Sequence, residues 1–336
     1  MKASHLSPQK RALLEQRLGG GAALQRTAAL PPIPRRPAQD GAPLSFIQRQ
    51  MWLIDQMTPG NPAYNLLAGY RLRGNLDVAM LERSFNEIIK RHESLRTTSA
   101  ARDGGGEPQQ QVHPEPTVSI RVTALDQLAE EQREARLLAL ASEEAVTPFD
   151  LSRLPLIRVT LFRLGASEHV LLVNVHHIVA DGLSFGVLLN ELDTFYRALR
   201  PPELAVQYGD FAHWQRQTQA HESAHDDQLE FWRTQLAGNL SALELPADRH
   251  RPAVQSFAGS DVLFTIPPAL AQQLRDLGGR AGCTAFMTML AAFQVLLHRH
   301  AGVDDIVIGT PIALRTRSEL EPLIGNFLNM VALRCD

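Results

Sequence analysis

Two adjacent histidines followed by an aspartate and a glycine are the residues of this chain best suited to chemistry. His176 and His177 end an apolar run, and Asp181 and Gly182 follow in the turn after it. Imidazole exchanges protons near neutral pH, which makes histidine the side chain most often used for general acid–base catalysis. A nearby carboxylate can orient such a ring or hold the turn through an ion pair. The pattern therefore indicates a proton-transfer site at the end of a strand.

Strand geometry predicts different roles for the two histidines. Successive side chains on a strand point to opposite faces, so the two imidazoles do not easily converge on one metal ion. One ring can face a cavity while the other is held inside, hydrogen-bonded to backbone or to a carboxylate. From the residues alone, His177 fits a satisfied core histidine as well as a catalytic one. Asp181 before a helix is also ordinary turn and N-cap chemistry.

Other residues with reactive side chains carry weaker patterns. Ser184 lies in the first turn of the expected helix and is interpreted as a capping residue, because no GxSxG elbow surrounds it. Cys283 comes before a helix and is expected to be a small buried residue. Cys283 and Cys335 lie far apart without a CxxC pattern, so neither a disulfide framework nor a zinc site is predicted. A reducing, cytoplasmic setting fits best.

Composition and charge exclude several classes of partner. The chain has 336 residues, 44% of them hydrophobic, which predicts a folded protein with two domains or two lobes. Its formal net charge of −3 provides no basic surface for nucleic acid and no polybasic stretch for an anionic membrane. The most apolar run, residues 170–189, is broken by His176, His177 and Asp181, so no membrane-spanning segment is expected.

The elements that must position the histidines follow from the periodicity of the apolar residues. Two β-rich runs at 156–164 and 169–176, separated by the loop GASE, predict a hairpin whose second strand ends at His176. A helix is predicted directly after the turn, over 183–199. The same reasoning predicts helices over 46–57, 78–92 and 126–146 and a strand over 65–73. The mixture predicts the α/β (α+β) class.

Composition also predicts the domain organisation. Residues 1–18 are expected to form a short helix, and the Pro-, Gly- and Ala-rich residues 19–43 a tether before the main fold. Helical patterns over 208–236 lead to the stretch ELPADRHRP, the expected crossing between an N-terminal lobe at 44–240 and a C-terminal lobe at 241–336. The second lobe is predicted to contain a strand over 261–266, helices over 269–281 and 284–300, and the strand DIVIGTPI.

The stretch HHIVADGLS resembles the HHxxxDG motif of condensation domains of non-ribosomal peptide synthetases. Four further stretches resemble that family's motifs in the family's order, namely PLSFIQRQMWLIDQMTPGNPAYN at 43–65, RHESLRT at 91–97, YGDFAHWQR at 208–216 and IGNFLNMVALR at 324–334. HHxxxDG alone is shared with epimerization domains and other acyltransferases of the chloramphenicol acetyltransferase fold. The opening and final motifs favour the condensation type, and the resemblance extends from Leu44 to the end of the chain.

The resemblance implies a chloramphenicol acetyltransferase-like fold, with two lobes forming a V-shaped pseudo-dimer and a second lobe that is incomplete at Asp336. It also implies an acyltransferase that joins an acyl or peptidyl thioester on an upstream carrier protein to the amine of an aminoacyl group on a downstream one. The substrates are then carried on 4'-phosphopantetheine arms, with no cofactor or metal bound directly. Expected partners are the donor and acceptor carrier domains and an adjoining adenylation domain, in antibiotic or other secondary-metabolite biosynthesis.

The same resemblance implies a role for each residue of the histidine motif. His177 carries over as the residue that helps the acceptor amine attack the donor thioester. His176 and Asp181 carry over mainly as structural members, and Asp181 is expected to pair with Arg315 of the GTPIALR segment. Gly182 is expected to keep the loop backbone close to the reacting centre.

The charged residues of RHESLRT are interpreted as scaffold. Arg91, Glu93 and Arg96 follow an amphipathic helix, and such clusters more often form structural ion networks than touch a substrate. We therefore expect them to pair with other charged side chains.

Several positions depart from the family's pattern. In the opening motif, Arg49 and Gln50 stand in reverse polar order to the usual glutamine and arginine, which puts the role of that arginine in doubt. Leu183 replaces a common tryptophan beside the histidine motif and is expected to tune the acceptor side. The remaining departures are Leu314 and Thr316, where asparagines are frequent, and Asn326 and Met330, which replace an aromatic residue and a threonine.

Two alternative functions stay open on the sequence. An acyltransferase of the same fold that uses acyl-CoA or a free amine predicts turnover without carrier proteins. A non-catalytic recruitment module predicts binding of a carrier protein or tailoring enzyme, with the histidine motif kept for folding alone.

Overall fold

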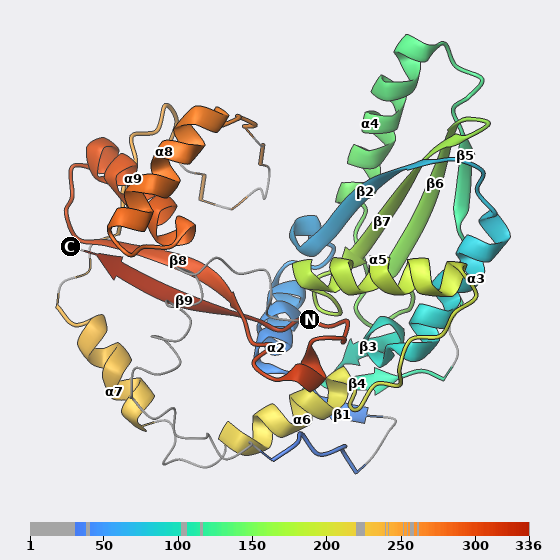
Figure 1. The fold of residues 1–336 in the computed structure, drawn as a ribbon. Coiled ribbons are helices and arrows are strands. Elements are labelled where there is room, and N and C mark those ends of the chain that lie inside the picture. Colours follow the sequence, from blue (N-terminus) through green and yellow to red (C-terminus); the bar gives the residue numbers. More distant parts are fainter. Residues whose placement is uncertain are drawn as a thin grey trace, which may run out of the picture. The chain divides into compact units, whose positions relative to one another are not determined.

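The computed structural model defines the fold of this protein (Figure 1). It describes residues 31–37, 41–101, 106–114, 117–219, 226–238, 240, 242–250, 252–253, 255, 259–260 and 262–335. The chain divides into two compact units, Met1–Pro34 and Arg35–Asp336, and all helices and strands of the described residues lie in the second. The predicted helix at 1–18 and residues 19–30 of the predicted tether lie outside the described residues.

A four-stranded sheet carries the two histidines. Its strands are β2 (Asn65–Arg73), β7 (Glu168–His176), β6 (Ile157–Gly165) and β5 (Arg121–Ala124), in that spatial order. The β5–β6 pair is parallel, whereas the other two pairs are antiparallel. Strands β6 and β7 form the hairpin that the sequence predicts, which is thereby confirmed. Strand β2 pairs along the whole of β7, so that Asn65 lies opposite His176.

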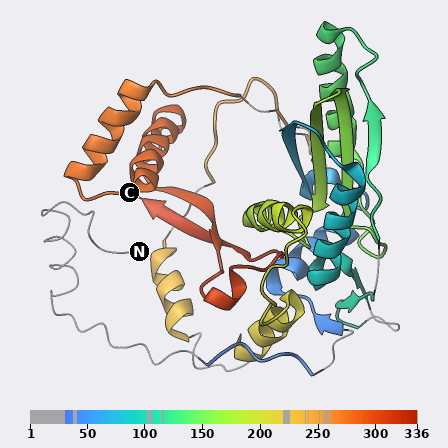
Figure 2. The same ribbon diagram turned by 45° about the vertical axis from the view of Figure 1, so that its right-hand side comes forward.

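Three helices cover the two faces of this sheet, namely α3 (Val78–Arg91), α4 (Glu130–Val146) and α5 (Gly182–Tyr196). Alternate residues of β7 from Leu171 to Val175 belong to a core that they share with α3 and α5. The intervening Val170 and Leu172 belong to a second core, shared with α4. Figures 1 and 2 show α4 along one side of the sheet and α5 along the other. The end of β7 is therefore held between two packed layers.

Two further elements pack near the start of the second unit. A small sheet has the order β1-β4-β3, with strands β1 (Gly41–Pro43), β4 (Gln109–Val112) and β3 (Thr97–Ala100). Helix α2 (Phe46–Met57) begins at a capping box in which the Ser45 side chain accepts from the Gln48 amide and Gln48 reaches back to the Ser45 amide. The predicted helix at 46–57 is thus confirmed, and its first turn is fixed locally.

The C-terminal part of the chain contains two helices and a two-stranded antiparallel sheet. These are α8 (Pro268–Arg280), α9 (Ala285–Ala301), β8 (Ile306–Ala313) and β9 (Leu328–Cys335). The predicted strand over 261–266 is wrong for residues 262–266, which pair with no strand of the described residues and expose Val262, Leu263 and Phe264. A β-rich composition forms a strand only where a neighbouring strand supplies cross-strand contacts.

Several predicted elements are confirmed with shifted ends. The helix expected over 126–146 begins at Glu130, because the Asp126 carboxylate instead pairs with Arg163 of β6 at 2.9 Å. The helical pattern over 208–236 comprises two helices, α6 (Tyr208–Gln219) and α7 (Asp226–Gln235). Among the described residues, no single helix has the length and apolar composition of a membrane span, and α8 with α9 meets that test jointly as one bent pair, at 104°.

The main fold begins before Leu44, so the tether predicted over 19–43 is too long at its C-terminal end. Strand β1 pairs with β4 over Gly41–Pro43. The Arg36 guanidinium, whose side chain is 1% exposed, contacts Glu93 at 2.7 Å and Asp210 at 2.9 Å. A buried cation with two carboxylates cannot belong to a solvated tether, because its charge would then have no reason to leave water. The lobe boundary predicted at 240/241 stays a prediction.

Replacing Arg36 by alanine is expected to destabilise the protein, because Glu93 and Asp210 would remain buried without their cation. Breaking a buried pair in this way costs about 3 to 5 kcal/mol of unfolding free energy. The measurement is chemical denaturation of wild type, Arg36→Ala and Arg35→Ala. Arg35 is exposed and donates to backbone carbonyls, so its loss should cost less than about 1 kcal/mol. Equal losses in the two variants would contradict the assignment of Arg36 to the folded unit.

Candidate active site

His176 is the inward-facing histidine of the pair. It is 3% exposed and lies between the ring edges of Tyr64 and Phe149, at centroid distances of 6.2 and 6.1 Å. Its Nδ1 accepts the Ile178 backbone N–H at 3.1 Å. Burial, with a smaller contribution from His177, lowers the pKa of His176 to about 4. The ring is therefore neutral at neutral pH and is held by backbone, as strand alternation predicts for one of the two histidines.

His177 follows the last residue of β7 and is half-buried. Its backbone N–H donates to the Tyr64 carbonyl at 2.8 Å, and its Nδ1 lies 2.8 Å from the Ala180 carbonyl oxygen. A carbonyl oxygen only accepts, so this contact assigns the ring proton to Nδ1. The lone pair is then on Nε2. His177 is thus oriented as a proton acceptor whose tautomer is set by its own loop.

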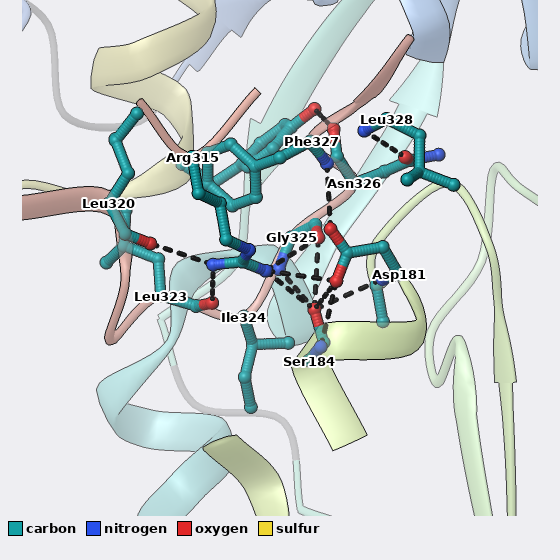
Figure 3. Close-up of polar contacts among 12 residues, drawn as sticks. Asp181, Ser184, Arg315, Leu320, Leu323, Ile324, Gly325, Asn326, Phe327 and Leu328 are labelled. Atoms are coloured by element: carbon teal, nitrogen blue, oxygen red, sulfur yellow. Dashed lines mark hydrogen bonds and ion pairs between the residues drawn. The ribbon is translucent and has the colours of Figure 1, made fainter. Parts of the chain in front are cut away.

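Asp181 is fully buried and starts α5 as its N-cap. Its Oδ1 accepts the Ser184 backbone N–H at 2.8 Å and the Arg315 guanidinium at 3.0 Å (Figure 3). Its Oδ2 accepts the Phe327 backbone N–H at 3.1 Å. The predicted pairing of Asp181 with Arg315 is confirmed, and so is the capping role of Ser184. Both interpretations of Asp181, as a helix cap and as an ion-pair partner, describe the same carboxylate.

Arg315 lies just after β8 and brings the C-terminal part of the chain to the histidine loop. Its side chain is 7% exposed, and its Nη1 donates to the carbonyls of Leu320 and Leu323 at 2.7 and 2.6 Å. The guanidinium also lies over the Phe327 ring, 4.2 Å from the centroid. Arg315 therefore folds the following turn around itself and presents residues 324–327 to Asp181 (Figure 3).

Residues 324–327, the IGNF segment, are held by the RHESLRT motif from another side. The Ile324 backbone N–H donates to His92 Nδ1 at 3.2 Å, and the Ser94 hydroxyl donates to the Ile324 carbonyl at 2.7 Å. Both polar backbone groups of Ile324 are thus satisfied by side chains, as a strand neighbour would satisfy them. Ile324 itself is buried in the core that includes α3 and α5.

The next residues of the IGNF segment are fixed by Tyr208. This fully buried tyrosine donates its hydroxyl proton to the Asn326 carbonyl at 2.6 Å, so the Ser45 hydroxyl, 2.8 Å away, donates to Tyr208 in turn. Burial raises the pKa of Tyr208 above its ordinary range, which keeps the phenol protonated. A Cβ at Gly325 would lie 2.1 Å from the Tyr208 ring, so this close approach requires glycine.

Gln48 links the opening motif to the loop after His177. Its Nε2 donates to the Ile178 carbonyl at 3.0 Å, while its Oε1 accepts the Ser45 backbone N–H. The sequence analysis did not single out Gln48, Ser45, Ser94 or Tyr208, although all four lie in the quoted motifs. Their partners are backbone groups of distant segments, which no side-chain pattern marks.

The ion network expected around RHESLRT is present. Arg91 contacts Glu191 at 2.9 Å, and His92 contacts the same carboxylate at 2.9 Å. Glu93 pairs with Arg36, and Arg96 lies 3.9 Å from Glu93. These residues connect α3 to α5 and to the start of the chain's second unit, so they act as scaffold for the His92–Ile324 contact.

Three other expectations have different outcomes. Cys283 is exposed, so its interpretation as a small buried residue is wrong. A Cβ at Gly182 would meet nothing within 4 Å, and the role of Gly182 near the reacting centre stays a prediction. Arg49, from the reversed polar pair, forms an exposed ion pair with Glu107 at 2.9 Å. Within the described part of the chain, no three His, Cys, Asp or Glu side chains gather closely enough to hold a metal ion.

The remaining departures from the family's pattern occupy different environments. Leu183 is 56% exposed and Met330 is also exposed, whereas Asn326 is fully buried. The Leu314 backbone N–H donates to the Phe327 carbonyl at 2.7 Å. The effect of Leu183 on the acceptor side stays a prediction.

Comparison with known proteins places these observations in one family. The Condensation domain profile matches residues 38–336, and the chain belongs to that family. A linear gramicidin synthase of Brevibacillus parabrevis is 44% identical over 303 residues, which are 88% of this chain and 6% of that protein. Phosphinothricin tripeptide synthetase PhsC of Streptomyces viridochromogenes is 42% identical over 336 residues, 98% of this chain and 30% of that protein. The chain thus spans less than a third of either relative.

Solved structures agree with this assignment. The X-domain from teicoplanin biosynthesis is 32% identical, with a TM-score of 0.79 over 91% of this chain and 68% of that chain. The first condensation domain of the CDA synthetase is 22% identical, with a TM-score of 0.72 over 88% of this chain and 71% of that chain, and shows the fold alone. The predicted chloramphenicol acetyltransferase-like α/β fold is confirmed by these neighbours.

Stability is expected to fall on acidification because His176 is buried neutral. The unfolded histidine titrates near 6.5 and the folded one near 4, so between these values the unfolded state binds more protons and acid favours unfolding. The loss should approach about 3 kcal/mol between pH 7 and pH 4. The measurement is urea denaturation across this range for wild type and His176→Phe. The variant should be destabilised at pH 7 and show a flatter pH dependence; parallel curves would contradict the assignment.

Two glycine-to-alanine substitutions are expected to have opposite effects on stability. Gly325→Ala pushes a methyl group into the buried Tyr208 ring and should cost about 1 to 3 kcal/mol or more. Gly186→Ala lies on the exposed face of α5, where a Cβ meets nothing within 4 Å, and should stabilise by up to about 1 kcal/mol. Thermal denaturation checks both. Equal tolerance at the two positions would show that the Gly325–Tyr208 approach is loose.

Proposed function

We propose that this chain forms an amide bond between an acyl or peptidyl thioester on an upstream carrier protein and the amine of an aminoacyl group on a downstream one. The observation that carries the proposal is the orientation of His177. Its Nδ1–H donates to the Ala180 carbonyl at 2.8 Å, which leaves Nε2 as a proton acceptor at the end of β7. Membership of the condensation family and relatives named as peptide synthetases support the same reaction.

The proposed reaction needs one proton acceptor and two well-placed substrates. The amine nitrogen attacks the thioester carbonyl carbon, a C–N bond forms, and Nε2 of His177 takes a proton from that nitrogen. The tetrahedral adduct then collapses, the C–S bond breaks, and the imidazolium returns the proton to the leaving sulfur. A free α-amino group titrates near ~7.7 to 8.0, so much of it is already neutral, and positioning contributes as much as base strength.

Asp181, Arg315 and His176 are proposed to support the site without touching the substrates. The Asp181–Arg315 pair is buried, and the His176 ring is enclosed by aromatic residues. These contacts hold the loop on which His177 stands. Loss of activity after changing any of the three would therefore be expected through the fold of the loop.

The proposed partners are a donor and an acceptor carrier domain, each presenting a 4'-phosphopantetheine arm, and an adjoining adenylation domain. No cofactor is proposed to bind the chain directly. The relatives support this proposal because the chain matches only 6% of the gramicidin synthase and 30% of the tripeptide synthetase, so such chains occur within much longer assemblies.

A recruitment function is the second candidate. One solved neighbour is a complex of the X-domain and OxyB from teicoplanin biosynthesis, and its X-domain is 32% identical to this chain. A domain of the same fold thus binds another protein. A third possibility, an acceptor that is not tethered to a carrier, is an arm of the test below.

The His177→Ala variant is expected to lose amide formation while it keeps its fold. General acid–base catalysis by one histidine typically contributes ~10² to 10⁴ in rate, and the half-buried ring makes no contact with Asp181 or Arg315 that would hold the loop. The assay mixes the full chain with a loaded donor carrier protein and a loaded acceptor carrier protein and follows the joined product by mass spectrometry. Circular dichroism and thermal denaturation confirm that both proteins are folded.

The assay separates the three candidate functions. A silent but folded His177→Ala beside an active wild type supports the proposal, and equal turnover by both would refute the role of His177. Turnover with acyl-CoA or with a free amine in place of the loaded carriers would favour the untethered acyltransferase. A folded wild type that binds carrier protein without any turnover would favour recruitment.

A further inference from the structure

We infer that His92 is a positioning residue for His177, acting through the backbone of the IGNF segment. His92 lies in RHESLRT, which the sequence interprets as scaffold, and no step of the proposed reaction uses it. Its imidazole joins two segments that are 232 positions apart in the chain, through the hydrogen bond from Ile324. This inference rests on the proposed function, since it assigns a supporting role in the same site.

The hydrogen bonds of His92 define a single tautomer. The Ile324 backbone N–H can only donate, so Nδ1 of His92, 3.2 Å away, must carry a lone pair. The ring proton is then on Nε2, which donates to Glu191 Oε2 at 2.9 Å. His177 has the opposite arrangement, with its proton on Nδ1. Both histidines thus have a tautomer fixed by the protein, and His92 is the buried one of the two, at 1% exposure.

The charges around His92 keep this arrangement neutral. Burial lowers the pKa of His92, and the cations of Arg91 and Arg315 lower it further, against an opposing effect of Glu191. Glu191 already receives Arg91 at 2.9 Å, and the net effect of its two partners lowers the pKa of Glu191 although burial opposes it. The His92–Glu191 contact is thus a hydrogen bond from a neutral imidazole to a carboxylate that Arg91 neutralises.

A continuous set of hydrogen bonds leads from Ile324 to the histidine loop (Figure 3). The next residue, Gly325, donates its backbone N–H to the Ser184 hydroxyl at 3.2 Å. Phe327 donates its backbone N–H to Asp181. Asp181 directly follows Ala180, whose carbonyl fixes the tautomer of His177. A shift of the IGNF segment would therefore move the acceptor that keeps the His177 proton on Nδ1.

Two substitutions separate the acceptor of His92 from its donor. Asparagine places an amide oxygen near the position of Nδ1, so His92→Asn can keep the bond from Ile324 while it loses the bond to Glu191. Glutamine places an amide N–H near the position of Nε2, so His92→Gln can keep the bond to Glu191 while it loses the acceptor for Ile324. His92→Phe keeps a ring of similar shape and removes both bonds.

The experiment compares wild type with these three variants in the full chain, by ¹⁵N NMR of the His177 ring and by amide-formation kinetics. We expect wild type and His92→Asn to share one His177 tautomer, protonated at Nδ1, and kcat values within about threefold of each other. His92→Gln and His92→Phe should show a mixed tautomer pattern and kcat lower by about tenfold to a hundredfold, with KM little changed. Exchange of the Ile324 amide proton should be fast in those two variants alone.

The readouts distinguish failure of this inference from failure of the proposed function. A His177 tautomer unchanged in all variants, or equal kcat losses in His92→Asn and His92→Gln, would overturn the positioning role and leave His92 as scaffold. A wild type without turnover would count against the proposed function, while the NMR comparison would still decide whether His92 positions His177. Melting temperatures, measured in parallel, show whether any loss of kcat merely follows loss of fold.

Discussion

The Asp181 carboxylate is fully buried, and removing such a charge from water costs several kcal/mol unless partners replace its hydration. Here the replacements come from Ser184 in its own helix, from Arg315 after β8 and from the Phe327 backbone. The need to satisfy one carboxylate therefore brings together segments that are far apart in the chain. The loop that carries His177 has its shape because these three partners converge on Asp181.

The two histidines illustrate how environment divides one residue type between two tasks. Burial lowers the pKa of His176 to about 4 and makes its ring a neutral part of the core. His177 lies at the end of the same strand but is half-buried, and one backbone carbonyl determines which nitrogen is free. The difference arises from position relative to the sheet, since β7 ends between them and the chain leaves the packed layers at His177.

Packing and chemistry are closely coupled around the IGNF segment. Tyr208 holds Asn326 by a hydrogen bond and leaves no room for a side chain at Gly325, while His92 and Ser94 hold Ile324. Residues of several motifs thus act on four consecutive positions. A family motif here marks a contact with that segment more often than a contact with substrate, which explains why so many of its residues are buried.

The sequence by itself determined the local elements and the location of the site. The hairpin of β6 and β7 follows from alternating residues that are neighbours in the chain, and the resemblance to condensation domains indicated Arg315 as the partner of Asp181. Only the tertiary structure decided that Arg36 belongs to the fold, that 262–266 is unpaired, and that His92 binds Ile324. These contacts join residues to distant groups or depend on whether a strand neighbour is present. Nearly every residue has a backbone N–H and all have a carbonyl, so such partners leave no pattern in the sequence.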